Sequence, residues 1–139
     1  MIIVDTNVLS ELMRGDPDPV VIAWIETQAA TALFTTTITQ AEILYGIRVL
    51  PKGKRRGEIE KAASEIFSID FAGRVLPFDQ DAAQAYAEIA AARRRMGRPI
   101  SQFDAQIAAI SYSRNSIVAT RNVPDFEGCG IQTIDPWDA

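Results

Sequence analysis

Histidine is absent from the 139 residues of this chain, and cysteine occurs once, as Cys129. Without histidine, Ser-His-Asp and Cys-His nucleophiles are excluded, as are zinc sites built from histidine and cysteine. The side chain most often used as a general base near neutral pH is missing as well. A lone cysteine excludes an internal disulfide and is typical of a reducing compartment, so we expect a cytoplasmic protein. Hydrolysis by this chain would have to use carboxylates, lysine, tyrosine or a metal-bound water.

Long apolar segments are also absent. No run approaches the roughly 20 residues that cross a bilayer. The start of the chain, Met1–Asn7, has neither a basic region nor a small-residue cleavage site. We therefore expect no membrane association, and we expect residues 1–139 to form a single domain, because the length leaves no room for two independent cores.

Basic residues are outnumbered, with 14 Lys and Arg against 18 Asp and Glu and a net charge of −4. This balance argues against a protein that binds nucleic acid simply by coating its phosphates. A cluster of acids that holds divalent cations would account for part of the excess. Two divalent cations would neutralise the net charge of −4.

Short apolar runs alternate with helical patterns, which predicts an α/β sandwich with a mostly parallel sheet. We expect a helix after the first strand, and a basic break at Pro51–Gly57. A further helix is expected to begin at Ser101, with Phe103, Ile107 and Ile110 on its inward face. The other expected helices are Pro17–Thr31, Thr39–Leu50, Glu58–Ile69 and Asp81–Met96. The expected strands are Met1–Val4, Leu33–Thr36, Arg74–Pro77, Ile117–Thr120 and Ile131–Ile134.

Asp5 directly follows the first of these strands. In open α/β sheets, ligands bind at the carboxyl ends of the strands, so a carboxylate at this position would face the binding crevice. The alternative is that Asp5 or one of the next two residues only caps the following helix. Position alone does not decide between these roles.

Glu42 and Asp104 each follow a hydroxyl residue by three positions, in Thr39-x-x-Glu42 and Ser101-x-x-Asp104. This spacing is that of a capping box, which is a purely structural role. It also predicts that both acids lie in the first turn of a helix, where they can face the same crevice as Asp5. Asp125 is a further acid shortly after a strand, although it could simply cap a short turn.

Together, these four acids are expected at one edge of the sheet. Two ionised carboxylates about 4 Å apart repel by roughly 4 kcal/mol at an effective dielectric constant near 20, so a cluster raises its pKa values or recruits cations. Oxygen ligands without histidine or cysteine favour Mg²⁺ or Mn²⁺ over zinc. Such an ion can ionise a bound water for attack on a phosphodiester, a reaction that needs no histidine.

The chain resembles the PIN-domain family, and within it the VapC-type toxins of bacterial toxin–antitoxin pairs, FitB included. The resemblance covers essentially the whole chain, with motifs in the family's order. The residues that carry it are MIIVDTNVLSEL at the start, Thr37-x-Thr39-x-Ala41-Glu42-Ile43-x-x-Gly46, Arg98-Pro-Ile-x-x-x-Asp104-x-x-Ile-Ala-Ala and Ala119-Thr120-Arg121-Asn122-x-x-Asp125-Phe126.

This resemblance implies a three-layer α/β/α fold and an endoribonuclease that depends on Mg²⁺ or Mn²⁺. It assigns metal binding and catalysis to the four acids, with Asn7 and Thr120 as polar neighbours, although Thr120 could equally be a β-branched residue that ends a strand. It also implies a homodimer held inactive by a VapB- or FitA-like antitoxin that binds operator DNA. We expect the helices that carry Leu12, Trp24 and Tyr45 to supply an apolar groove for the antitoxin, and one of its basic residues to reach Asp5, Glu42 or Asp104.

Two basic clusters are candidates for contact with RNA phosphates. The first contains Lys52, Lys54, Arg55 and Arg56, and the second contains Arg98 together with the Arg93–Arg95 run. The alternative for both is a solvated helix end, which is favourable at a helix C-terminus.

Three other functions compete with the toxin nuclease. Haloacid-dehalogenase-like phosphatases also place an acid after the first strand, but their Asp-x-Asp is Asp5-x-Asn7 here and their late acid pair is missing. A non-catalytic regulatory partner of a DNA-binding antitoxin would have no reason to keep four mutually repelling acids. A PIN nuclease of RNA maturation would be expected to carry an additional RNA-binding domain.

Overall fold

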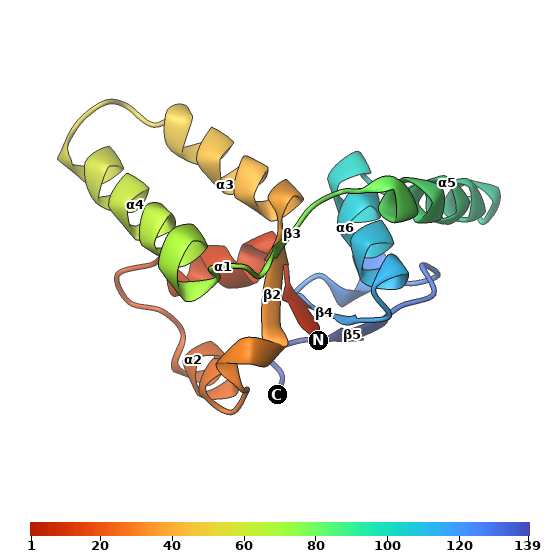
Figure 1. The fold of residues 1–139 in the computed structure, drawn as a ribbon, viewed down its shortest axis with the longest axis horizontal. Coiled ribbons are helices and arrows are strands. Elements are labelled where there is room, and N and C mark those ends of the chain that lie inside the picture. Colours follow the sequence, from red (N-terminus) through yellow and green to blue (C-terminus); the bar gives the residue numbers. More distant parts are fainter.

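In the computed structural model, which describes residues 1–139, five strands form one sheet in the order β3-β2-β1-β4-β5 (Figure 1). Every pairing between neighbours is parallel, and Ile3 in the central strand lies opposite Phe34 on one side and Val118 on the other. Buried apolar residues in these central strands explain why they need cover on both faces. The strands are β1 (Ile2–Val4), β2 (Leu33–Thr36), β3 (Val75–Leu76), β4 (Ile117–Ala119) and β5 (Gln132–Ile134).

Six α-helices cover the two faces of the sheet, as α1 (Thr6–Leu12), α2 (Pro19–Glu26), α3 (Thr37–Arg48), α4 (Lys54–Glu65), α5 (Gln80–Arg95) and α6 (Gln102–Ser113). One hydrophobic cluster joins α5 and α6 to the sheet, and a second joins it to helices α1 to α4. In Figure 1, α5 and α6 accordingly lie on one side of the sheet, and α1, α2 and α4 lie on the other. The expectation of a three-layer α/β/α sandwich with a parallel sheet is confirmed. None of the helices is long and apolar enough to cross a membrane.

Helix α3 begins earlier than its sequence pattern predicts. Thr36, at the end of β2, is the N-cap, and its hydroxyl accepts from the backbone N–H of Thr39 at 3.1 Å. The prediction that Thr39 opens this helix with Glu42 in its first turn is therefore wrong. Thr39 lies inside the helix, and Glu42 lies in the second turn.

Helix α6 begins as predicted, because the hydroxyl of Ser101 accepts from the backbone N–H of Asp104 at 3.2 Å. Phe103 was expected to face inward but is 51% exposed. Ile107 and Ile110, the other two residues predicted for the inward face, are buried as expected.

The basic break after α3 is also shorter than predicted. Helix α4 already starts at Lys54 rather than at Glu58. Arg56 holds this first turn in place, because its guanidinium pairs with Glu60 at 2.8 Å and donates to the carbonyl of Leu50 at 3.4 Å. On the same face of the sheet, α2 spans only Pro19–Glu26 of the predicted Pro17–Thr31, and the carboxylate of Asp18 caps it.

Candidate active site at the carboxyl edge of the sheet

The central strands deliver polar residues to one edge of the sheet. Asp5 follows β1 and Thr120 follows β4, and the backbone N–H of Asp5 donates to the carbonyl of Ala119 at 2.9 Å, so the two strand ends lie side by side. Thr36 ends β2 at the same edge and starts α3 there. Parallel strands therefore bring together segments that are more than a hundred residues apart in the sequence.

Asp5 is 4% exposed and is surrounded by donors. One carboxylate oxygen accepts from the backbone N–H of Thr6 at 2.8 Å, which makes Asp5 the N-cap of α1. The other oxygen accepts from the hydroxyl of Thr120 at 2.8 Å and from the amide of Asn7 at 3.1 Å. Burial raises the pKa of Asp5, the bonds from Thr120, Thr6 and Asn7 lower it, and the charge of Asp104 raises it further. The net pKa is above the ordinary value.

Both expected polar neighbours thus lie against Asp5. The fully buried Thr120 hydroxyl also accepts from the backbone N–H of Asn122 at 3.1 Å and from the amide of Asn7 at 3.2 Å. Because Asn7 offers an amide donor, this position provides no second carboxylate of the kind that a haloacid-dehalogenase-like site requires. Asp5, Asn7 and Thr120 form one hydrogen-bonded unit.

Glu42 faces this unit from α3. One of its carboxylate oxygens accepts from the hydroxyl of Thr6 at 3.0 Å, and the hydroxyls of Thr6 and Thr39 lie 3.1 Å apart. Partial burial raises the pKa of Glu42, the bond from Thr6 lowers it, and the charges of Asp5 and Asp104 raise it again. The sequence pattern suggested only capping roles for Thr6 and Thr39, and gave no signal that their hydroxyls meet at Glu42.

Asp104 approaches from the first turn of α6. Burial raises its pKa, the hydrogen bond from Ser101 lowers it, the charge of Asp125 raises it, and the charge of Arg93 lowers it. Asp125 itself is exposed, in the short 3₁₀ turn Val123–Phe126. The structure therefore gathers Asp5, Glu42 and Asp104 into one electrostatic cluster, and it places Asp125 on the side of Asp104. No three of these groups lie close enough together to contact a single metal ion directly.

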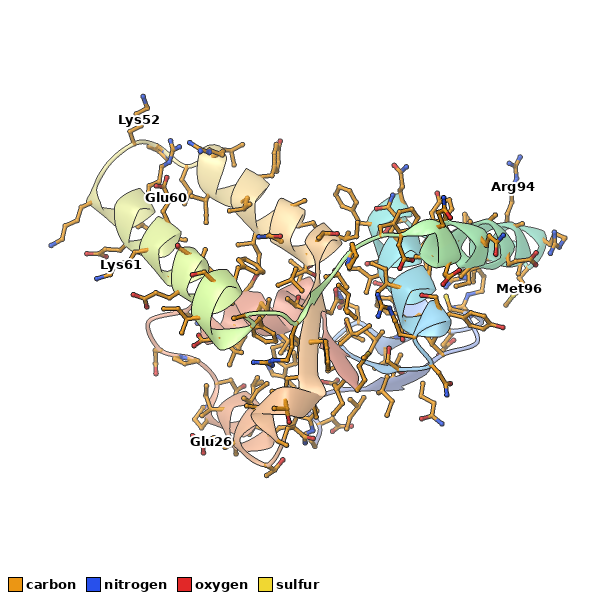
Figure 2. The ribbon with its side chains drawn as sticks, viewed as in Figure 1. Glu26, Lys52, Glu60, Lys61, Arg94 and Met96 are labelled. Carbon is orange, nitrogen blue, oxygen red and sulfur yellow. The ribbon has the colours of Figure 1, made fainter.

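Arg93 stabilises the loop that carries Asp125. It is 4% exposed, and its guanidinium donates to the backbone carbonyls of Arg98 at 2.7 Å, Asp125 at 2.7 Å and Glu127 at 2.9 Å. The inclusion of Arg93 in a solvated basic cluster is wrong, because it points inward while its neighbour Arg94 extends from α5 into solvent (Figure 2). The run of arginines gave no signal of which one is buried.

The remaining predicted phosphate contacts are not gathered at the acids. Lys52 lies at the tip of the α3–α4 hairpin (Figure 2), and Lys54 and Arg55 begin α4 beside it. Arg56 is neutralised by Glu60, and Arg98 pairs with Glu127 at 3.1 Å. Of these residues, only Arg98 belongs to the acid region, because it also donates to the carbonyl of Pro124 at 3.4 Å.

A groove leads away from the acids along α3 and α4. Thr6 and Glu42 line one end of it, its floor includes Ile43, Ile47 and Ile59, and Arg14 and Arg55 also line it. Of the three helices predicted to supply an apolar groove, those that carry Leu12 and Tyr45 line this one, and the helix that carries Trp24 does not. Trp24 is buried in the core beneath α2, Tyr45 projects from α3 with 71% of its surface exposed, and Leu12 packs against the same core as Trp24.

Comparison with known proteins connects this geometry to a family. The PIN domain model matches residues 2–124 of the chain. VapC ribonuclease Y4jK of Sinorhizobium fredii is 41% identical over 138 residues, which cover 99% of each chain. Toxin FitB of Neisseria gonorrhoeae is 34% identical over 137 residues, again 99% of each. A solved structure of FitAB bound to an IR36 DNA fragment has a TM-score of 0.92 at 34% identity, and it covers 99% of this chain and 96% of that one. This chain therefore belongs to the PIN-domain family, in the group that contains VapC and FitB.

Proposed function

We propose that this protein is a metal-dependent endoribonuclease that acts as the toxin of a toxin–antitoxin pair in the cytoplasm. One observation carries the proposal. Asp5, Glu42 and Asp104 come from three different elements to one edge of the sheet, and burial together with repulsion from at least one neighbouring acid raises the pKa of each. Such an arrangement destabilises the fold unless a cation compensates it, so its purpose is functional. Similarity to a VapC ribonuclease supports RNA as the substrate, and similarity to toxin FitB supports the role as a toxin.

The donor set fits Mg²⁺ or Mn²⁺. All four acids offer hard oxygen ligands, and the chain contains no histidine that would favour zinc. Since no three acids lie within reach of one ion, a bound Mg²⁺ would complete its coordination with water, as this ion usually does. Asp5, Glu42, Asp104 and Asp125 would hold the ion, some of them only through its bound water. When bound, it would supply an ionised water and charge neutralisation at the phosphodiester.

The chain's own contribution is to fix the orientation of these acids. The hydroxyl of Thr120 and the amide of Asn7 hold the Asp5 carboxylate, and the hydroxyl of Thr6 holds Glu42. The guanidinium of Arg93 anchors the backbone of Asp125. Hydrogen bonds of this kind orient the ligands of a metal site, and their loss typically reduces metal affinity or activity about 10- to 100-fold.

The direct test is RNA cleavage by the purified protein, freed of any partner, with and without EDTA. We expect cleavage with Mg²⁺ or Mn²⁺ that stops on chelation and is abolished in Asp5→Asn and Asp104→Asn, and circular dichroism should show that both variants fold. Attack by water would leave a 5′-phosphate and a 3′-hydroxyl, and end-labelling of the fragments identifies these groups. Cleavage by either folded variant at the wild-type rate would contradict the four-acid site. A protein that binds metal and cleaves no RNA would instead be a regulatory partner.

We further propose that the toxin forms a homodimer and that a VapB- or FitA-like antitoxin, which also binds operator DNA, inhibits it. The groove that starts at Thr6 and Glu42 has the apolar floor that a peptide segment needs. At the end of the groove that Thr6 and Glu42 line, a guanidinium or ammonium group of the antitoxin would compensate the negative charge of the acids. Coexpression with the neighbouring small gene should restore growth. Alanine substitution of each Arg and Lys in the bound segment should identify one residue whose loss weakens inhibition. If none does, inhibition is steric.

A further inference from the structure

Arg121 lies at the rim of the acid cluster, and neither the nuclease site nor the antitoxin groove includes it. It follows Thr120 directly, and its backbone N–H donates to the side-chain carbonyl of Asn7 at 3.1 Å. The amide of the same Asn7 donates to Asp5. The side chain of Asn7 therefore links the backbone of Arg121 to Asp5, the most buried acid of the site, and holds that backbone in a fixed position.

The side chain of Arg121 is also held in place. Its guanidinium carbon lies 4.9 Å from the centre of the Trp137 ring. That ring packs against the core cluster beneath α1 and α2, and the Trp137 backbone N–H donates to the carboxylate of Asp135 at 2.9 Å, so the ring is anchored as well. Stacking engages the flat face of a guanidinium and leaves its five N–H donors, which lie in the plane, available to a ligand.

Other arginines near the site have their charge or their donors occupied. Arg98 is paired with Glu127, and Arg93 is buried against backbone carbonyls. Arg121 is exposed and belongs to none of the four ion pairs of the chain. It is thus an oriented cation without a carboxylate partner, on a residue whose backbone adjoins the acid cluster through Asn7.

A phosphodiester that approaches this pocket is repelled by the acids and by the net charge of −4. A guanidinium at the rim attracts phosphate and can bind two of its oxygens at once. We propose that Arg121, held in place by Trp137, binds a phosphate of the RNA backbone next to the cleaved bond. This inference rests on the proposed nuclease function and gives the site a binding residue that orients the substrate.

The test measures RNA binding separately from cleavage. An Asp104→Asn background prevents hydrolysis, and the probe is a short, fluorescein-labelled single-stranded RNA of randomised sequence, followed by anisotropy over a range of NaCl concentrations. We expect Arg121→Gln to weaken binding about tenfold at low salt and to reduce the slope of log K against log [NaCl] by roughly one, as the loss of one phosphate contact does. Trp137→Leu keeps the charge and frees the side chain, so affinity should fall less, with the slope unchanged.

Arg114→Gln is the matched control, because Arg114 lies at the end of α6, at the opposite edge of the sheet, and pairs with Asp79 at 3.6 Å. It should alter neither the affinity nor the slope. In the otherwise wild-type enzyme, Arg121→Gln should raise KM and change kcat by less than about twofold.

Two results would overturn the inference alone. One is an Arg121→Gln variant that matches Arg114→Gln in affinity and slope. The other is a loss of affinity at unchanged slope together with a lower melting temperature, which would mean that Arg121 only stabilises the fold. If the Asp104→Asn protein with Arg121 intact bound no RNA, the proposed nuclease function would fail as well, so the two failures are distinguishable.

Discussion

Asp5 illustrates how one residue serves both structure and chemistry. Its carboxylate caps α1 through the backbone N–H of Thr6, and it also accepts from Thr120 and Asn7 inside the acid cluster. The two roles, which looked like alternatives in the sequence, use different oxygens of the same group. Three donors offset part of the free-energy penalty of burying this charge, and they leave the carboxylate only one orientation.

The first prediction therefore concerns Thr120→Val, which keeps the shape of a buried side chain and removes its hydroxyl. Asp5 would lose a donor and the N–H of Asn122 would lose its acceptor, so we expect the free energy of unfolding to fall by about 1–3 kcal/mol. Activity should fall roughly 10- to 100-fold because the acid is no longer held. Urea unfolding and RNA cleavage at saturating Mg²⁺ measure the two effects.

Thr133→Val is the control, since this half-buried threonine of β5 is bonded to neither Asp5 nor Asn122. It should leave cleavage near the wild-type rate. If Thr120→Val also cleaved RNA near the wild-type rate, any β-branched side chain would suffice at position 120, as one interpretation of the sequence holds.

Single residues also show why part of the site could not be predicted. The acids were found because they follow strands or sit at fixed distances from hydroxyl residues, and both signals are local. Arg93 gave no such signal, because its burial depends on a loop more than thirty residues later in the chain that presents carbonyls to it. Thr6 is similar, since its bond to Glu42 joins two helices that only the fold brings together.

At the scale of whole elements, the helix starts position the acids. Helices α3 and α6 begin with hydroxyl caps at the carboxyl edge of the sheet, so the second turn of α3 delivers Glu42 there and the first turn of α6 delivers Asp104. The sequence identified both helices, but its pattern placed the start of α3 at Thr39. Thr36 is the cap because β2 ends there and places it in extended conformation, while Thr39 is already helical. The end of the strand therefore determines which threonine caps the following helix, and where the strand ends depends on its pairing within the sheet.

The second prediction is that Thr36→Val weakens α3 where it meets the site. Valine matches the volume of threonine and cannot accept from the N–H of Thr39, so we expect about 1 kcal/mol lower stability, as for other lost caps. Cleavage should fall too, because Glu42 lies within the first two turns of this helix. Thr37→Val, one residue along, removes a hydroxyl that does not cap the helix and is the matched control. If both variants melted at the same temperature as the wild type, Thr36 would not be the functional cap of α3.

For the whole molecule, the acid cluster concentrates negative charge in a protein that is already acidic. The pKa of Asp5, Glu42 and Asp104 is raised in the folded state, so these groups bind protons more tightly folded than unfolded. Their contribution to stability is fully present below the ordinary values of 3.8 and 4.5, and it is lost as the pH rises through the folded pKa values. At neutral pH the metal-free fold carries the full electrostatic penalty of its own site.

The last prediction follows from this unfavourable contribution of the ionised acids to the stability of the metal-free fold at neutral pH. Asp104→Asn removes one charge from the cluster, so the metal-free variant should melt at a higher temperature than metal-free wild type at pH 7. The difference in melting temperature should shrink toward zero as the pH falls to 3.8, the ordinary pKa of an aspartate.

Mg²⁺ should raise the melting temperature of the wild type, because a ligand that binds only the folded state stabilises it by about 2.7 kcal/mol at a ligand concentration of one hundred times its dissociation constant. Asp104→Asn should respond far less to Mg²⁺. Differential scanning calorimetry in EDTA and in Mg²⁺ provides both comparisons, with NaCl at matched ionic strength to separate binding from screening. If Asp104→Asn were less stable than wild type at pH 7 in EDTA, Asp104 would stabilise the metal-free fold. That result would contradict its proposed role as a metal ligand whose charge destabilises the fold until a cation compensates it.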